Sequence, residues 1–164
     1  MRIICVFLIL FPFLTFSQSW TNVSNFTGDG RHHPITFSND NYGFVVSGSY
    51  LNDVFKYEKS SDTWSQLQDF PGSGRGYSYG VSIGNKAYLG FGSTDNGTFP
   101  TDWWEYDMNN DTWLQLSSFI GSGRNHPAMI VVNNKIYVGC GSNDNGNLGD
   151  WWEYDVNLDS WSQK

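Results

Sequence analysis

One pattern recurs three times along this chain of 164 residues, at residues 53–64, 102–113 and 150–161. Each copy begins with Asp, ends with Trp eleven residues later, and carries a Tyr seven residues before that Trp. Internal repetition at a period of about 40–50 residues is typical of solenoids and propellers, in which each repeat buries its faces against its neighbours. The repeat therefore restricts the fold more than any other feature of the sequence.

Each repeat also holds the same further parts in the same order. A Gly-x-Gly-Arg turn comes first, at 28–31, 72–75 and 121–124. Two short apolar segments joined by Asn or Gly follow, which is typical of a β-hairpin because these residues tolerate positive φ. A variable loop, the aromatic segment and a strand that begins at the Trp complete the unit. Four antiparallel strands at this period form a propeller blade.

We therefore predict an all-β propeller domain over residues 18–164, with three four-stranded blades at about 31–70, 75–119 and 124–164. Residues 20–26 resemble the Trp-to-Phe segments that end the first two blades, and predict a lone fourth strand ahead of blade one. Because a closed ring usually needs about four to eight blades, we expect an incomplete ring and a longer parent protein. The alternative is that two half-rings assemble into one propeller. Open blade faces that carry aromatic residues also predict self-association.

The first residues predict a secretory signal peptide at 1–17. Met1 and Arg2 form a short positive start, and residues 3–16 are almost entirely apolar. That run is shorter than the roughly 20 residues that a membrane span needs, and small or polar residues follow it where a peptidase could cut. A membrane anchor is the alternative interpretation. We expect a secreted, periplasmic or cell-surface protein with no transmembrane span after cleavage.

Charge and cysteine content narrow the class of protein further. Without residues 1–17 the chain keeps eight Lys and Arg against sixteen Asp and Glu, a net charge of −8. Nucleic acid is excluded as a partner because its binding depends on neutralising phosphates with Lys and Arg. Cys140 would be the one cysteine of the mature chain, so no intrachain disulfide can form. An exported protein without disulfides suits a bacterial envelope.

The order of these parts resembles the kelch repeat over residues 20–164. The resemblance rests on Gly-Arg, the apolar hairpin, the Gly-rich strand end, Asp-aromatic-aromatic-x-Tyr and Asp-Thr/Ser-Trp. The paired glycines of the family are replaced by Gly-Phe-Gly at 90–92 and Gly-Cys-Gly at 139–141, and the first unit keeps only Gly48. The resemblance implies a kelch-type propeller of the galactose oxidase superfamily. The copper site of galactose oxidase uses two Tyr, two His and a Cys crosslinked to Tyr. Nothing in this sequence matches that set, so we expect no metal and no cofactor, and Cys140 fits a packing position.

Residues that occupy the same position in every blade are expected to be structural. The Trp and Tyr of each pattern are predicted to pack between blades, where large rings bury much apolar area; they are Tyr57, Trp64, Tyr106, Trp113, Tyr154 and Trp161. Asp107 and Asp155 are predicted to bond the backbone of the next turn rather than to act as catalytic carboxylates. Sugar stacking by one Trp of the pairs 103–104 and 151–152 is the alternative for those positions.

The candidate site combines the Arg-bearing turns with the variable loops, which should emerge at the same mouth of the propeller. Arg31, Arg75 and Arg124 could bind carboxylates or acidic sugars through their guanidinium forks. The predicted site also includes the residues two positions after each Arg, namely His33, Tyr77 and His126. It is completed by one acidic residue from each of the loops 93–101 and 142–149, Asp95 and Asp144. The alternative is that each Arg bonds backbone carbonyls of the next blade. The two loops lack the ligand spacing of a calcium site.

These features predict an exported binding or interaction module that takes a protein or glycan ligand at the mouth, rather than an enzyme. One alternative is the N-terminal part of a propeller enzyme, either a carbohydrate oxidase or a sialic-acid mutarotase-like protein, whose active residues lie in further blades. Another alternative is a rigid spacer in a surface protein.

Overall fold

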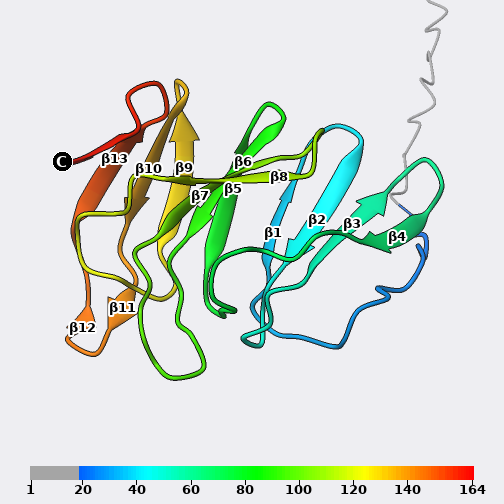
Figure 1. Cartoon of the computed structure of the whole chain (residues 1–164), viewed down its shortest axis with the longest axis horizontal. Coiled ribbons are helices and arrows are strands. Elements are labelled where there is room, and N and C mark those ends of the chain that lie inside the picture. Colours follow the sequence, from blue (N-terminus) through cyan, green and yellow to red (C-terminus); the bar gives the residue numbers. More distant parts are fainter. Residues whose placement is uncertain (1–18) are drawn as a thin grey trace, which may run out of the picture.

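The computed structural model describes residues 19–164, so the predicted signal peptide lies outside the described residues. Three four-stranded antiparallel sheets stand side by side in an arc (Figure 1). Blade one contains β1 (Ile35–Ser38), β2 (Tyr42–Val46), β3 (Val54–Glu58) and β4 (Thr63–Gln66). Blade two contains β5 (Tyr79–Ile83), β6 (Lys86–Gly90), β7 (Trp103–Asp107) and β8 (Thr112–Leu116). Blade three contains β9 (Ala128–Val132), β10 (Lys135–Gly139), β13 (Trp151–Asp155) and β14 (Ser160–Gln163), and its loop carries the small hairpin of β11 (Ser142–Asn143) and β12 (Gly146–Asn147).

Each blade follows the order first, second, third and fourth strand, as the sequence predicts. The hairpins between first and second strands turn at Asn39, Gly84 and Asn133–Asn134. Positive φ is found at Gly84, Asn133 and Asn134. In the first hairpin, Oδ1 of Asn39 accepts hydrogen bonds from the amides of Asn41 and Tyr42. The first strands β1, β5 and β9 lie next to one another, so they form the inner edge of the arc. The prediction of three kelch-like blades in an incomplete ring is confirmed for the described residues.

The hydrophobic core lies between blades rather than within them. Between blades one and two, Tyr106 of blade two packs edge-on against Phe44 of blade one, with ring centroids 5.5 Å apart, and it also packs on Trp113 of its own blade at 4.4 Å. Between blades two and three, Trp161 packs against Trp103 at 5.2 Å and against Phe119 at 4.9 Å. The predicted packing of the repeated Trp and Tyr at blade interfaces is therefore confirmed at both joints.

The repeated acidic residues fix the turn between third and fourth strands. In every blade the Tyr hydroxyl donates to the Asp five residues later, at 2.8, 2.7 and 2.7 Å: Tyr57 to Asp62, Tyr106 to Asp111 and Tyr154 to Asp159. Asp107 accepts bonds from the amides of Asn109 and Asn110, and Asp155 does the same in blade three. The structural interpretation of these carboxylates is confirmed.

Residues 20–26 form no strand, which corrects the prediction of a lone fourth strand. The segment lies against blade one, where Phe26 packs edge-on against Phe55 and Trp64 at 4.9 and 5.0 Å. The amide of Ser24 donates to Asp62, and Trp64 Nε1 donates to the carbonyl of Ser24. A fourth strand needs a third strand as its partner, and no described strand forms a ladder with this segment.

Cys140 departs from its expected packing position. The matching residue of blade two, Phe91, is buried between blades two and three, whereas Cys140 is exposed. The difference arises because no described blade covers that side of blade three. Within residues 19–164 there is also no helix with the length and apolar character that a membrane crossing requires.

Candidate functional site

The three turn arginines form the same buried ion pair in every blade. Each guanidinium donates two parallel hydrogen bonds to the Asp that directly precedes the third strand. The pairs are Arg31–Asp53, Arg75–Asp102 and Arg124–Asp150, with Nη2–Oδ2 distances of 2.8, 2.8 and 2.9 Å. The arginine side chains are 3%, 0% and 0% exposed. Hydrogen bonding from Arg124 holds the pKa of Asp150 at about 2.

The remaining arginine donors are also occupied. In each turn Nε donates to the carbonyl two residues earlier, and Nη1 donates to a carbonyl at the end of the second strand of the same blade, namely Ser47, Phe91 or Cys140. Each guanidinium also lies over the ring of a Phe. The distances from Cζ to the ring centroid are 5.0, 4.9 and 5.1 Å, for Phe26, Phe70 and Phe119. These contacts correct the expectation that the forks face a ligand, and they place the bonded carbonyls in the same blade, not in the next.

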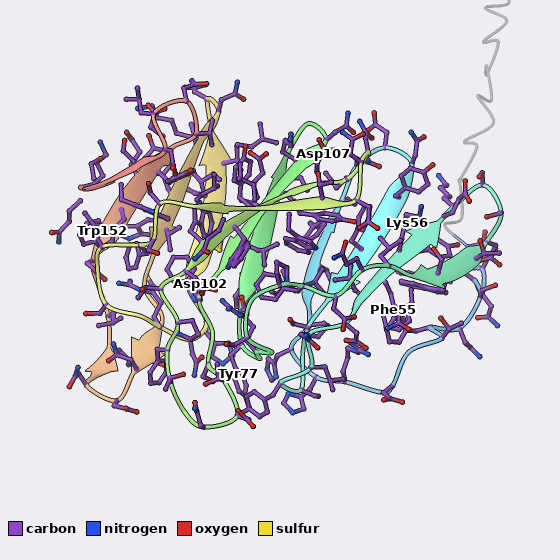
Figure 2. The ribbon with its side chains drawn as sticks, in the orientation of Figure 1. Phe55, Lys56, Tyr77, Asp102, Asp107 and Trp152 are labelled. Atoms are coloured by element: carbon purple, nitrogen blue, oxygen red, sulfur yellow. The ribbon has the colours of Figure 1, made fainter. Side chains whose placement is uncertain are left out.

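The residues two positions further on behave differently, because they converge at one place. The rings of His33 and Tyr77 lie 4.3 Å apart, those of Tyr77 and His126 5.0 Å apart, and those of His33 and His126 5.4 Å apart. Both histidines are exposed and Tyr77 is half-buried. We call these three residues the axial cluster. Figure 2 shows Tyr77 at the edge of the arc from which the β6–β7 loop projects, with Asp107 at the opposite edge.

The three residues of the axial cluster share an unusual backbone conformation. His33, Tyr77 and His126 have φ values of 50°, 59° and 50°, a left-handed conformation that is uncommon for residues with a large side chain. Hydrogen bonds between neighbouring turns stabilise it: the amide of His126 donates to the carbonyl of Tyr77, and Gly92 N donates to the carbonyl of Arg124. Such strain costs on the order of 1–3 kcal/mol for each residue. The same conformation recurs at structural positions of the blades, such as Ser47, Phe91 and Cys140, so it does not by itself mark a functional site.

Two further residues border the axial cluster without having been singled out in the sequence. His32 Nδ1 lies 2.9 Å from His33 Nδ1, and the His32 ring centroid lies 5.8 Å from that of Tyr77. Tyr79, at the start of β5, is 43% exposed and lies 6.4 Å from His126. His32 occupies the position of Gly76 and Asn125, so the repeat gives no signal for it.

Asp95 and Asp144 are not brought into the cluster. Both are exposed in their loops, and neither carboxylate takes part in a hydrogen bond or ion pair within residues 19–164. Asp144 lies between β11 and β12, and Asp95 lies in a loop closed by a bond between the hydroxyls of Thr94 and Thr98. No group of three or more His, Cys, Asp or Glu side chains in the described part of the chain is arranged to hold a metal ion.

The axial cluster presents side chains whose chemistry suits a small polar ligand. Aromatic rings offer apolar faces on which a sugar ring can lie, and imidazole nitrogens donate to and accept from hydroxyl and carboxylate groups. Histidine also changes its charge near neutral pH, which suits recognition of an anion or transfer of a proton. The site is an open surface at the inner edge of the arc, and its shape depends on all three blades.

The comparisons with known proteins point to the same fold. No family model matches the chain. Two curated proteins named N-acetylneuraminate epimerase, from Haemophilus influenzae strains PittEE and 86-028NP, are each 29% identical to it over 86 residues, covering 47% of this chain and 23% of theirs. The solved structure of YjhT aligns with a TM-score of 0.71 and 18% identity over 81% of this chain and 51% of that chain.

The chain thus spans about a quarter of the length of these curated relatives and about half of the solved chain. The alignment with YjhT covers 81% of this chain. In each sheet the strands follow the order that the sequence repeat predicts. The described residues therefore form three blades of a kelch-type β-propeller.

Proposed function

We propose that the axial cluster binds an acidic sugar of the N-acetylneuraminate class. The observation that carries this proposal is the convergence of His33, Tyr77 and His126, one from each blade, within 5.4 Å of one another. Similarity to proteins named N-acetylneuraminate epimerase supports the choice of ligand. The protein then acts as a binding module whose ligand site lies at the mouth of the propeller.

The chemistry of the ligand assigns a role to each part of the site. The sugar ring packs on Tyr77, and the carboxylate accepts hydrogen bonds from the imidazoles of His33 and His126. Asp95 and Asp144 lie in loops outside the axial cluster and have no role in this proposal. The arginines contribute indirectly, by fixing the turns that carry the cluster.

Isothermal titration of the purified protein with N-acetylneuraminate tests this proposal. Tyr77→Ala and His126→Ala are expected to weaken binding at least about tenfold, since each removes a direct ligand contact. Trp20→Ala is the control, because Trp20 is fully exposed and lies outside the cluster. N-acetylglucosamine, which lacks a carboxylate, should bind at least about tenfold more weakly than the acid. Equal binding by the wild type and both cluster variants would disprove the assignment.

Catalysis is the second candidate function, favoured by the named activity of the curated relatives. Epimerisation needs one group that takes up a proton and another that returns it, and the imidazoles of His33 and His126 are two such groups, with ring centroids 5.4 Å apart. Proton NMR of N-acetylneuraminate separates the two candidates. Catalysis predicts faster exchange between its forms, which His33→Ala and His126→Ala abolish, whereas a binding module leaves the exchange rate at its uncatalysed value.

Two further expectations belong to this proposal. The predicted signal peptide implies export, which is tested by cell fractionation of the full chain with and without residues 1–17. A protein ligand at the mouth, or a role as a spacer, would be indicated if no sugar binds while the fold is intact.

A further inference from the structure

Blade one carries two histidines in the turn before β1, whereas the matching turns of blades two and three carry one ring each. His32 occupies the position of Gly76 in blade two and of Asn125 in blade three. Its Nδ1 atom lies 2.9 Å from Nδ1 of His33, which belongs to the axial cluster. We propose that His32 is a positioning residue, which donates a hydrogen bond from Nδ1 to His33 and thereby keeps Nε2 of His33 protonated as a donor to the ligand carboxylate. This inference rests on the function proposed above and adds a residue to that site.

The backbone of His32 is fixed by the loop between β2 and β3. The amide of His32 donates to Oγ of Ser49, and the amide of Ser49 donates to the carbonyl of His32, both at 3.1 Å. The matching residues of blades two and three form an isolated β-bridge at the same place. His32 is exposed, and its ring therefore projects to the surface from an ordered backbone.

The two imidazoles meet through one nitrogen each. Their planes are 82° apart and their centroids 5.1 Å apart. Both rings also contact Tyr77 (Figure 2), whose centroid lies 5.8 Å from that of His32 and 4.3 Å from that of His33. Because Nδ1 of His33 faces His32, Nε2 is the nitrogen of His33 that remains for a ligand in the axial cluster.

The contact between two Nδ1 atoms restricts where the protons lie. A neutral imidazole holds one N–H proton, so this hydrogen bond needs one ring protonated on Nδ1 and the other protonated on Nε2. When His32 holds the proton on Nδ1, Nε2 of His33 carries a proton and can donate to a carboxylate. In the reverse arrangement Nε2 of His33 is a bare acceptor, which repels a carboxylate. An acidic ligand therefore requires the first arrangement, because the bond made by one ring nitrogen sets the state of the other.

His32 also gives the site a place to hold an added proton. In the first arrangement Nε2 of His32 is unprotonated, and a proton added there creates a cation without breaking the contact with His33. The hydrogen bond between the rings is then charge-assisted, and a positive charge lies one ring away from the ligand carboxylate. Two cations in contact are disfavoured, so the pair accepts one proton rather than two.

The other titratable groups around the pair are aromatic or already bound. The turn of His32 itself carries Asp29 and Arg31, and Arg31 is bound to Asp53. Within residues 19–164 neither imidazole of the pair has a carboxylate as an ion-pair partner, and the arginines of the other two turns are also bound to their own Asp. The remaining titratable side chains come from the neighbouring turns, from β5 and from the β2–β3 loop: Tyr77, His126, Tyr79 and Tyr50.

Nitrogen-15 NMR of the imidazoles tests the hydrogen bond without any ligand. His32, His33 and His126 are the three histidines of the chain, so a long-range proton–nitrogen spectrum shows three rings. At pH 8 we expect His32 alone to be protonated on Nδ1, because an isolated imidazole in water prefers its proton on Nε2. His33→Ala should return His32 to that preferred form, and His126→Ala should leave His32 unchanged. A spectrum in which His33 is the ring protonated on Nδ1, or in which no ring is, would overturn the inference.

Titration with N-acetylneuraminate at pH 8 and pH 6 measures what His32 contributes to binding. His32→Ala should bind about threefold more weakly than the wild type at pH 8, and the difference should widen at pH 6, where the wild type holds the added proton. His32→Asn keeps a hydrogen-bonding group near the place of Nδ1 but takes up no proton. It should match the wild type at pH 8 and bind about threefold more weakly at pH 6. Trp20→Ala is the control and should match the wild type at both pH values.

The two measurements separate this inference from the function on which it rests. If no sugar binds while His32 is protonated on Nδ1, the proposed function is wrong and the hydrogen bond assigned to His32 is still supported. If the sugar binds and His32→Ala matches the wild type at both pH values, the proposed function stands and His32 has no part in the site. An Asn variant as weak as the Ala variant at pH 8 also contradicts the inference, because a hydrogen bond at this position would then not support binding.

Discussion

In each of the three turns, the arginine and the residue of the axial cluster lie two positions apart, yet their surroundings differ: the arginine is buried and fully hydrogen-bonded, whereas the axial residue is at least partly exposed. Arg75 is completely buried and donates to Asp102 and to two backbone carbonyls. Tyr77 is half-buried, lies in a left-handed conformation, and contacts residues from both neighbouring turns. The arginine is identical in every blade, whereas the axial position alternates His, Tyr and His. Residues that repeat hold each blade together, and residues that vary at the axis form the candidate site.

The first prediction tests the structural role of the arginines by removing one of them. Arg75→Ala leaves Asp102 without the partner that compensates its burial, and we expect the free energy of unfolding to fall by about 3–5 kcal/mol. Arg75→Lys keeps the charge but loses the two parallel bonds, so it should cause a smaller loss. Urea denaturation measures both. A loss below about 1 kcal/mol for Arg75→Ala would mean that the ion pair is not structural.

A second variant tests whether the turn and the strand end form one unit. Gly92 has a φ of 81°, and an added Cβ would lie 2.8 Å from Cβ of Ser78. Gly92→Ala is expected to lower the free energy of unfolding by roughly 2–3 kcal/mol, from backbone strain together with the clash. Gly97→Ala is the matched control, because Gly97 has a φ of 80° and nothing within 4 Å of the added atom, so it reports the backbone strain alone. Equal losses in the two variants would show that the close contact is unimportant.

The third test concerns the strain at the axis. Replacing Tyr77 by Gly removes a large residue from a left-handed conformation, and we expect the free energy of unfolding to stay the same or rise by about 0.5–1 kcal/mol. Ligand binding should be lost in the same variant. Thermal unfolding and sugar titration on one sample measure the two effects. Strong destabilisation by Tyr77→Gly would place Tyr77 with the structural residues instead.

The smallest expected effect is a dependence of stability on acid. Hydrogen bonds from Arg124 lower the pKa of Asp150 to about 2, and bonds from Lys135, Tyr137 and Lys164 lower that of Glu153 to about 2. A carboxyl group whose pKa is lower in the folded state stabilises the fold above its unfolded value and loses that contribution as pH falls through the folded value. The melting temperature should therefore be constant above pH 5 and fall between about pH 4 and 2. Asp150→Asn should flatten this fall, and an unchanged profile would contradict the assignment.

The repeat made most of the fold predictable. Period, hairpin turns and the Trp and Tyr columns indicated blades and their joints, because these follow from local pattern and from equal spacing. The segment at 20–26 was misassigned as a strand because sequence shows the pattern of a strand but not the presence of its partner. Cys140 was misassigned as packed for a similar reason, since burial depends on the neighbouring blade.

The site was only partly predictable. The sequence placed His33, Tyr77 and His126 at one mouth because they keep a fixed offset from the turn. It did not pair each Arg with the first Asp of the following pattern, because loops of different length separate them by 22, 27 and 26 residues. His32 gave no signal, since it stands outside the repeat, and only the spatial contact with His33 identifies it.

The most direct measurement compares two variants of one turn, Arg124→Lys and His126→Ala, by titration with N-acetylneuraminate and by urea denaturation of the same samples. We predict that Arg124→Lys lowers the free energy of unfolding but binds the sugar like the wild type while folded. His126→Ala should keep its stability within about 0.5 kcal/mol and bind at least about tenfold more weakly. The reverse pattern, with affinity lost in Arg124→Lys and kept in His126→Ala, would contradict the division of the turn into a structural arginine and a binding residue at the axis.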